Sequence, residues 1–336
     1  MYEIDFLAVG DESKSGDAIT LRYTNPESGE PIIGIIDAGF ESSGTALVEH
    51  VSTYYNTNRV AFVISTHPDE DHINGMGVVM RELNVAYLFI HRPKLHGHPS
   101  NSGSKPAEEL VKLAEDQNAK VIEPFQGVGG FGKSLLIAGP TVPFYEEVLR
   151  EQTKTSKTKP SLAARFGAPI LSEIRKMIEK FPVERDFDDA GGDNPRNNSS
   201  VIISLMLDGE HMLLPGDAGV PAITAAMNYL DAQERTANRP KLLLLPHHGS
   251  RHNLDLHTIQ RILGDRTDDE RGTAVSSVGK TSKNPSPRVA NAAGRRGYPV
   301  LRTAGMNLRC KSPDVPKRKG WVDAVPLSPL DETYDH

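Results

Sequence analysis

Short apolar runs, rich in Ile, Val and Leu, recur along the chain between polar turns and predict many β-strands. Some of these runs are apolar throughout and suit strands that are buried on both faces. Others alternate with polar residues, which suits two packed sheets. The predicted strands span residues 4–9, 18–23, 32–36, 60–64, 85–90, 135–138, 201–207, 211–214, 241–245, 274–278 and 299–302.

Helix-periodic stretches fall between these strands, at residues 43–55, 73–83, 107–118, 163–180, 221–231, 256–263 and 288–296. Strands interleaved with helices predict an α/β layer protein with helices outside the sheets. Residues 142–196 mix a basic stretch, a helix and an acidic Gly/Asp loop. We interpret them as an insertion within a single domain that spans 1–336, with a basic, Pro-containing C-terminal segment at about 280–336.

The composition excludes several classes of protein. A chain of 336 residues buries a sizeable core without disulfides, and the single cysteine, Cys310, excludes an internal disulfide and a Cys-rich zinc module. The first residues are acidic where a signal peptide needs Lys or Arg, and no apolar run approaches the roughly 20 residues of a membrane span. We therefore expect a soluble cytoplasmic protein with no membrane partner.

The densest chemistry lies in the loop that follows the predicted strand 60–64. His67, Asp69, Asp71 and His72 place four metal-competent side chains within six residues, just before a predicted helix. An aspartate here also suits a helix N-cap, but one cap leaves two histidines and a second aspartate unexplained.

Two later strands also end in metal-competent side chains. Gly216-Asp217 follows the run 211–214; taken alone, this pair is more simply explained as part of a turn. His247-His248-Gly249-Ser250 follows the run 241–245. Strand ends at one edge of a sheet converge, so the three motifs together indicate one pocket. Imidazole and carboxylate ligands suit zinc, manganese or iron.

The set of motifs resembles the metallo-β-lactamase fold. It is most similar to the hydrolase domain of the ComEC-type DNA-uptake proteins and its free-standing relatives, which carry the same His-x-Asp-x-Asp-His loop. The resemblance runs from about residue 4 to 304 and includes, in the family's order, Gly16-Asp17-Ala18, Ile36-Asp37-Ala38-Gly39, Asn197-Asn198-Ser199-Ser200 and Ser277-Val278-Gly279-Lys280.

The resemblance implies a four-layer αββα sandwich with two divalent ions, zinc or manganese, at one edge of the sheets. His67 and Asp69 would bind the first ion; Asp71, His72 and His247 the second; and Asp217 both. Asp71 and His248 are the catalytic candidates, with His248 beside the ligands or donating a proton. The usual third-motif histidine is absent, and Asn197, Asn198 and Ser199 stand in its region. The candidates for substrate binding are Asn198, Ser199, Ser250, Lys280 and Lys283. Relatives often carry a His-Pro pair after the Ser-Val-Gly-Lys strand, and this chain has none there.

Charge is distributed unevenly along the chain. Between Lys280 and Gly320 there are eleven basic residues and one acid, a balance of +10, so the other 295 residues carry −16 of the total of −6. Such a segment suits either a basic face for an anionic polymer or pairing with the acidic remainder of the chain.

Together these features predict a metal-dependent hydrolase, foremost a phosphodiesterase or nuclease acting on nucleic acid. One alternative is a hydrolase of small esters, lactones or cyclic nucleotides, because the fold alone does not select the substrate. Another is a metal-binding subunit of a bacterial defence or DNA-processing assembly that binds a protein partner through the insertion or the C-terminal segment.

Overall fold

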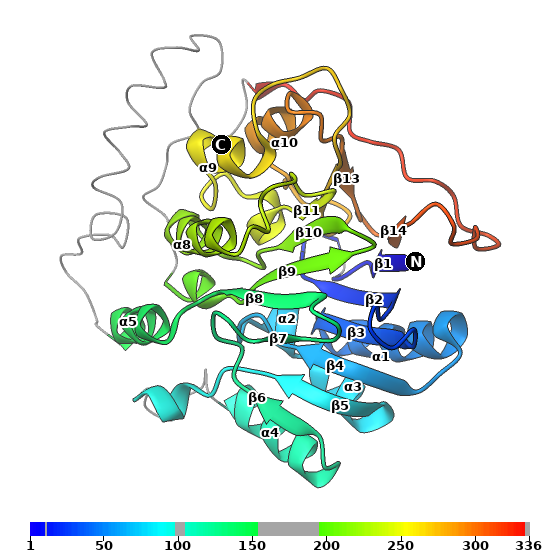
Figure 1. Cartoon of the computed structure of the whole chain (residues 1–336), viewed down its shortest axis with the longest axis vertical. Helices are drawn as coiled ribbons and strands as arrows, with labels where there is room; N and C mark the ends of the chain where they lie inside the picture. The colour runs from blue at the N-terminus through cyan, green and yellow to red at the C-terminus, as the bar shows by residue number, and fades with distance from the viewer. Residues whose placement is uncertain (11, 98–104, 154–194, 333–336) are drawn as a thin grey trace.

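Two seven-stranded mixed sheets form the centre of the molecule (Figure 1). The computed structural model describes residues 1–10, 12–97, 105–153 and 195–332. In the first sheet the strand order is β14-β1-β2-β3-β4-β5-β6, and in the second it is β13-β12-β11-β10-β9-β8-β7.

The first sheet has an antiparallel part and a parallel part. Its strands are β1 (Tyr2–Phe6), β2 (Ala18–Thr24), β3 (Pro31–Ala38), β4 (Arg59–Ile64), β5 (Asn84–Phe89), β6 (Lys120–Ile122) and β14 (Leu308–Lys311). β3 to β6 are parallel neighbours, whereas β14, β1, β2 and β3 pair antiparallel. The carboxyl ends of β3, β4 and β5 therefore lie at one edge of the sheet.

The second sheet has the same division. Its strands are β7 (Gly129–Gly130), β8 (Leu135–Gly139), β9 (Ile202–Leu207), β10 (Glu210–Leu214), β11 (Leu242–Leu244), β12 (Thr273–Ser276) and β13 (Val300–Arg302). β10 to β13 are parallel neighbours, and β7 to β10 pair antiparallel. The loops after β10 and β11 therefore leave from a common edge.

Helices cover the outer face of each sheet (Figure 1). The helices are α1 (Glu41–His50) with a π-helical continuation η1 (Val51–Tyr55), α2 (Glu70–Ile73), α3 (Met76–Glu82), α4 (Lys105–Asp116), α5 (Val142–Thr153), α8 (Val220–Ala232), α9 (Leu256–Leu263) and α10 (Pro287–Gly294). Short 3₁₀ turns are η2 (Pro93–His96), η4 (Asn197–Ser199) and η5 (Pro246–Gly249). Three apolar layers result: α1, α3 and α4 on the first sheet, the space between the sheets, and α8, α9 and α10 on the second sheet. The αββα sandwich expected from the sequence is confirmed.

All eleven predicted strands are present, with ends shifted by at most a few residues. Of the predicted helices, the one at 163–180 lies outside the described residues. The stretch 73–83 is divided into α2 and α3 at Gly75, because the Gly75 N–H donates to the Gly39 carbonyl and not within the helix. A Cβ on Gly75 would lie 2.1 Å from the carbonyl oxygen of Ala38, so this close approach requires glycine. α5 and the strands β6, β7 and β14 were not predicted. Most of the proposed insertion lies outside the described residues, so a role for it in binding a partner stays a prediction.

Much of the C-terminal positive charge is paired within the protein. Arg318 lies 2.8 Å from both Glu3 and Asp5, two carboxylates that are almost fully buried, and its guanidinium stacks 4.4 Å from the Tyr54 ring centre. Arg309 also pairs with Glu3. These contacts hold the segment after β14 against the outer face of the first sheet.

Two further cations of the segment pair with acids that follow it. Lys317 lies 2.8 Å from Asp323, and Arg295 lies 2.9 Å from Glu332. The chain then returns toward α10 (Figure 1), where the Leu327 amide donates to Val300. Arg318, Arg309, Lys317 and Arg295 thus pair with acids of the same protein. The balance of +10 therefore overstates the positive charge that this segment presents to a polymer.

Among the described residues, no helix has both the length and the apolar character that a membrane crossing requires.

Candidate metal centre

His67 and Asp69 lie in the loop that connects β4 to α2 at the carboxyl edge of the first sheet, and Asp71 and His72 lie in α2 itself. Asp69 occupies the N-cap position of α2, yet its side chain makes no capping hydrogen bond. The capping interpretation therefore fails for Asp69. One of its oxygens, Oδ2, lies 3.7 Å from Nε2 of His67.

Asp217 lies between the two halves of the site. It follows β10 and Gly216, whose φ of +55° is the left-handed conformation that glycine adopts most readily. Its Oδ2 lies 3.6 Å from Nε2 of His67 and 3.7 Å from Nε2 of His247, whereas its Oδ1 lies 3.5 Å from Nε2 of His72. One carboxylate oxygen thus faces each group of imidazoles.

His247 and His248 have unusual backbone conformations. Both have positive φ, 47° and 59°, which costs energy for residues with a side chain and is typical of functional sites. The turn directs the Nε2 atom of His248 to 3.6 Å from Asp71 Oδ2 and stacks its ring 5.6 Å from that of His72. His248 is buried, whereas the side chain of His247 is 38% exposed.

This geometry corrects the order of the two histidines. The sequence analysis assigned His247 to the ion of Asp71 and His72, and His248 to a place beside the ligands. The structure instead groups His248 with Asp71 and His72. His247 lies with His67 and Asp217, in the half of the site that lacks the usual third-motif histidine.

The donor set fits a divalent ion, because ligand atoms of Asp71, His72 and His248 all lie within 4.8 Å of one another. Two ligands that are about 2.1 Å from one ion at a tetrahedral angle lie about 3.4 Å apart. The separations here are 3.5–3.9 Å in both groups. Four buried atoms at the centre have no hydrogen-bond partner among the described residues: Nε2 of His67, His72 and His248, and Oδ1 of Asp217. Buried polar atoms without partners are costly, and a bound cation satisfies all four.

Asp37, which the sequence analysis did not select as a site residue, orients His72. Asp37 ends β3, and its Oδ2 lies 2.7 Å from Nδ1 of His72. Thr66 donates from its backbone and hydroxyl to the same carboxylate, and the hydroxyl also lies 3.0 Å from Nδ1 of His67. These bonds fix both rings with Nε2 toward Asp217, the usual arrangement of ligand histidines.

Asp17 and Arg196 complete the surroundings of the site. Asp17 is buried, and its carboxylate lies within 4.8 Å of ligand atoms of His72 and Asp217. Arg196 Nε lies 3.1 Å from Oδ1 of Asp69, the oxygen that does not face His67. Gly16-Asp17 was a visible motif in the sequence, but Arg196 had no signal there.

The electrostatics keep His67 and Asp217 in forms that bind a cation. Burial and the neighbouring His72 lower the pKa of His67 to about 3, so its Nε2 keeps its lone pair at neutral pH. Burial alone would raise the pKa of Asp217, but His72, His248 and His67 hold it well below its usual value. Burial alone would lower the pKa of His72 and of His248, but Asp217 with Asp37 raises the first and Asp217 with Asp71 raises the second, so a cation bound there takes the place of a proton. Burial raises the pKa of Asp17 to about 6.

The substrate-binding candidates are more dispersed. Asn198 is buried and accepts from the Gly219 amide, and the Ser199 hydroxyl donates to the Arg196 carbonyl. The Ser250 hydroxyl accepts from the His252 amide. Lys280 and Lys283 are exposed on the loop after β12, which packs on Glu12 and Ser15. Asn198, Ser199 and Ser250 thus support loops next to the ligands.

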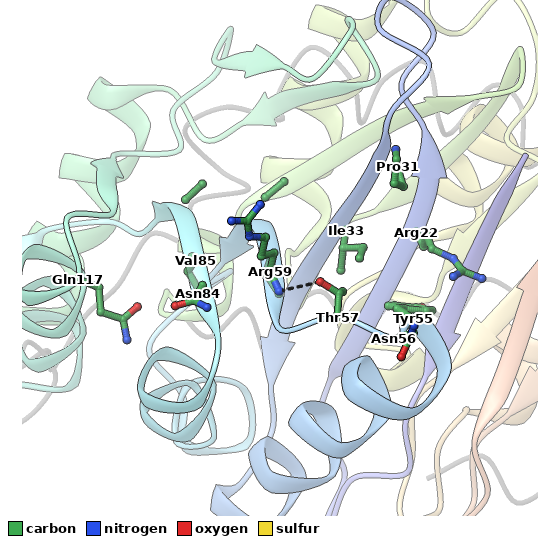
Figure 2. A pocket seen from close by; sticks show the side chains of 13 residues that line it. Arg22, Pro31, Ile33, Tyr55, Asn56, Thr57, Arg59, Asn84, Val85 and Gln117 are labelled. Atoms are coloured by element: carbon green, nitrogen blue, oxygen red, sulfur yellow. Dashed lines mark hydrogen bonds between the residues drawn. The ribbon is translucent and has the colours of Figure 1, made fainter.

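A groove of about 650 Å³ lies at the other end of the first sheet, beside the amino ends of β3, β4 and β5 (Figure 2). Arg22 and Arg59 are its only charged lining residues. The Arg22 guanidinium pairs with Glu3 and stacks 4.9 Å from the Tyr55 ring. Because the ligand loops leave the opposite end of these strands, the groove is separate from the metal centre.

His91, which follows β5, makes the stability of the fold depend on pH. It is buried between the rings of Phe125 and Tyr145, at 4.7 and 4.3 Å, and burial with the nearby His96 lowers its pKa to about 3. The folded protein therefore keeps it neutral, whereas the unfolded chain binds a proton below pH 6.5. The contribution of neutral His91 to the free energy of unfolding is fully present above pH 6.5 and declines toward pH 3. Between pH 7 and 5 it falls by about 2 kcal/mol.

The variant His91→Phe should therefore lose about 2 kcal/mol less free energy of unfolding than wild type between pH 7 and 5, measured by urea unfolding. Equal losses in the two proteins would contradict the assignment.

No protein-family model and no curated protein matches the chain. Solved structures with a similar fold include a diphosphatase from the PhnP family (10% identity, 93% of this chain and 98% of that chain, TM-score 0.43). Others are a metallo-β-lactamase superfamily protein of Sulfolobus tokodaii (14%, 71% and 77%, 0.33) and a metallo-β-lactamase of Cronobacter sakazakii (10%, 71% and 76%, 0.36). Because these TM-scores lie below 0.5, we take the architecture and the site from the chain's own strand order and side-chain geometry.

Proposed function

We propose that the protein is a metal-dependent hydrolase of the metallo-β-lactamase type, with a dinuclear centre that cleaves phosphodiester bonds. One observation carries the proposal: two groups of His and Asp ligands share Asp217, one carboxylate oxygen facing each group. The first group is His67, Asp69 and His247, and the second is Asp71, His72 and His248. The Asp-substituted loop supports a relation to the ComEC-type hydrolase domains.

When bound, two divalent ions at such a site polarise a phosphoryl oxygen and lower the pKa of a coordinated water. The chain contributes the orientation of the ligands. Asp37 and Thr66 hold the rings of His72 and His67, and Arg196 holds the outer oxygen of Asp69.

Charge favours an anionic substrate at this site. Three ligand carboxylates against two divalent ions leave roughly +1. The Arg196 guanidinium adds a positive charge at the edge, and the nearby Asp17, whose pKa is about 6, offsets most of it at neutral pH. This supports a phosphodiester over a neutral ester or lactone. Oxygen-rich ligands favour manganese and imidazoles favour zinc, so both metals belong in the test.

The test measures hydrolysis of single-stranded DNA, RNA, a cyclic dinucleotide and bis-p-nitrophenyl phosphate by the purified protein. We expect no activity after removal of metal by a chelator, and recovery with Mn²⁺ or Zn²⁺. The Asp71→Ala protein, purified in the same way, should lose about 10²- to 10³-fold in activity, which excludes a contaminating nuclease. Cleavage of the polymers indicates a nuclease, and cleavage of the small diesters alone indicates a phosphodiesterase. Equal hydrolysis by the wild-type and Asp71→Ala proteins would refute the proposal.

A further inference from the structure

Asn253 connects two of the candidate ligands. It is 4% exposed and lies in the loop between η5 and α9. Its Nδ2 donates to the backbone carbonyl of Asp217 at 2.9 Å, and its Oδ1 lies 2.8 Å from Nδ1 of His247. One buried amide therefore holds both the segment of Asp217 and the ring of His247.

The bond to Asp217 fixes which end of the Asn253 amide faces His247. A carbonyl oxygen cannot donate, so Nδ2 must face the Asp217 carbonyl and Oδ1 must face the imidazole. An amide oxygen only accepts, so Nδ1 of His247 must carry the proton. The lone pair of His247 is then on Nε2, the atom 3.7 Å from Oδ2 of Asp217.

A second asparagine lies at the same nitrogen. Nδ2 of Asn197 is 3.1 Å from Nδ1 of His247, and a donor there would favour the opposite tautomer, with Nε2 protonated and unable to bind a cation. The Asn197 amide has no other side-chain hydrogen bond among those found for the described residues, so it is able to turn its oxygen toward Nδ1. Asn253 has no such freedom and decides between the two tautomers.

We propose that Asn253 is a positioning residue that holds His247 in the Nδ1-protonated tautomer and ties it to Asp217, so that both face one cation. The inference rests on the proposed metal centre and deepens it. The backbone of His247 is left-handed and its side chain is 38% exposed, so the orientation of its ring depends on the hydrogen bonds at Nδ1, of which the bond from the buried Asn253 is the shorter.

The first test needs no substitution and no metal. Nitrogen-15 NMR of the histidine rings in the metal-free protein at pH 8 distinguishes the two tautomers directly, with His247→Gln used to assign the signal. We expect the proton of His247 on Nδ1. A His247 ring with its proton on Nε2 would overturn the proposal, whatever the protein hydrolyses.

The second test counts bound ions by equilibrium dialysis with Mn²⁺ and with Zn²⁺. Asn253→Leu removes the acceptor and should weaken one of two ions by about 10- to 100-fold. Asn253→Asp keeps an acceptor for Nδ1 but loses the donor to the Asp217 carbonyl, so it should bind that ion more tightly than Asn253→Leu and less tightly than wild type. The matched control is Asn291→Leu, because Asn291 also bonds a backbone carbonyl and amide, those of Leu330, far from the site. A merely structural role predicts similar losses of stability in the Asn253→Leu and control proteins, with both ions retained, and that result would overturn the proposal.

Failure of this inference is distinguishable from failure of the proposed function. If the tautomer and the two ions are found but no substrate is cleaved, the role of Asn253 stands and the activity is wrong. If diesters are cleaved by a protein whose His247 is protonated on Nε2, the activity stands and the role of Asn253 is wrong.

Discussion

Replacing Asp217 by alanine should cost the protein both divalent ions and lower its hydrolytic activity by about a thousandfold or more. The two oxygens of Asp217 face both groups of candidate ligands, 3.5–3.7 Å from His67, His72 and His247. A metal centre contributes several kcal/mol to a hydrolytic transition state, and about 4 kcal/mol corresponds to a thousandfold in rate. Metal content by elemental analysis and steady-state hydrolysis of a diester measure the two losses.

The matched control is Asp231→Ala, which removes an exposed aspartate at the end of α8 that pairs with Arg261. It should keep both ions and full activity. Retention of two tightly bound ions in Asp217→Ala would show that Asp217 does not bridge them.

The regular part of the fold was predictable because its apolar runs are long and lie in the interior. β3, β4 and β9 have six, four and five buried positions, and their apolar patterns predict strands without tertiary information. The missed strands are short and lie at sheet edges. β7 consists of two glycines, and β14 (Leu308–Lys311) carries the basic residues of an apparently charged segment. Edge strands this short carry too few positions for any pattern to be recognised.

The sequence indicated which motifs come together at the edge of the sheets, but not which of the two adjacent histidines lies beside Asp71 and His72. Preferring His247 assumed that the residue nearer the strand end points into the site. The chain instead enters two successive left-handed conformations, which exchange the directions of the two rings. Such a conformation depends on contacts that sequence spacing does not contain, including the bonds from Asn253 to His247 and Asp217.

Charge counting along the sequence found the basic segment but could not find its partners. Glu3 and Asp5 lie more than 300 residues before Arg309 and Arg318, and only the pairing of β1 with β14 brings them together. Buried carboxylates need such partners, so Arg309 and Arg318 stabilise the fold by neutralising Glu3 and Asp5 and are not available to bind a ligand. Any polymer-binding surface must therefore use other cations.

The exchange of His247 and His248 makes a prediction that separates the structure from the sequence-based order. Each single variant, His248→Ala or His247→Ala, should lose one ion of two and about 10²- to 10³-fold in activity, because each breaks one half of a dinuclear site. Ion counts alone do not tell which half is lost. Double variants distinguish the two halves. Two substitutions among the ligands of one ion should cost little more activity than one of them, whereas substitutions among the ligands of different ions should have additive effects.

We expect the double variant His248→Ala/Asp71→Ala to keep one ion and to have nearly the same hydrolytic activity as Asp71→Ala. The reason is that Oδ2 of Asp71 lies 3.6 Å from Nε2 of His248, so both residues belong to one half of the site. The double variant His248→Ala/Asp69→Ala should lose both ions, because Asp69 lies with His67 in the other half. The corresponding pairs with His247 should show the opposite pattern: an additive loss with Asp71→Ala, and little further loss with Asp69→Ala. If His247 rather than His248 behaves as one unit with Asp71, the order from the sequence is right and the turn at residues 246–249 directs its rings differently from the arrangement described.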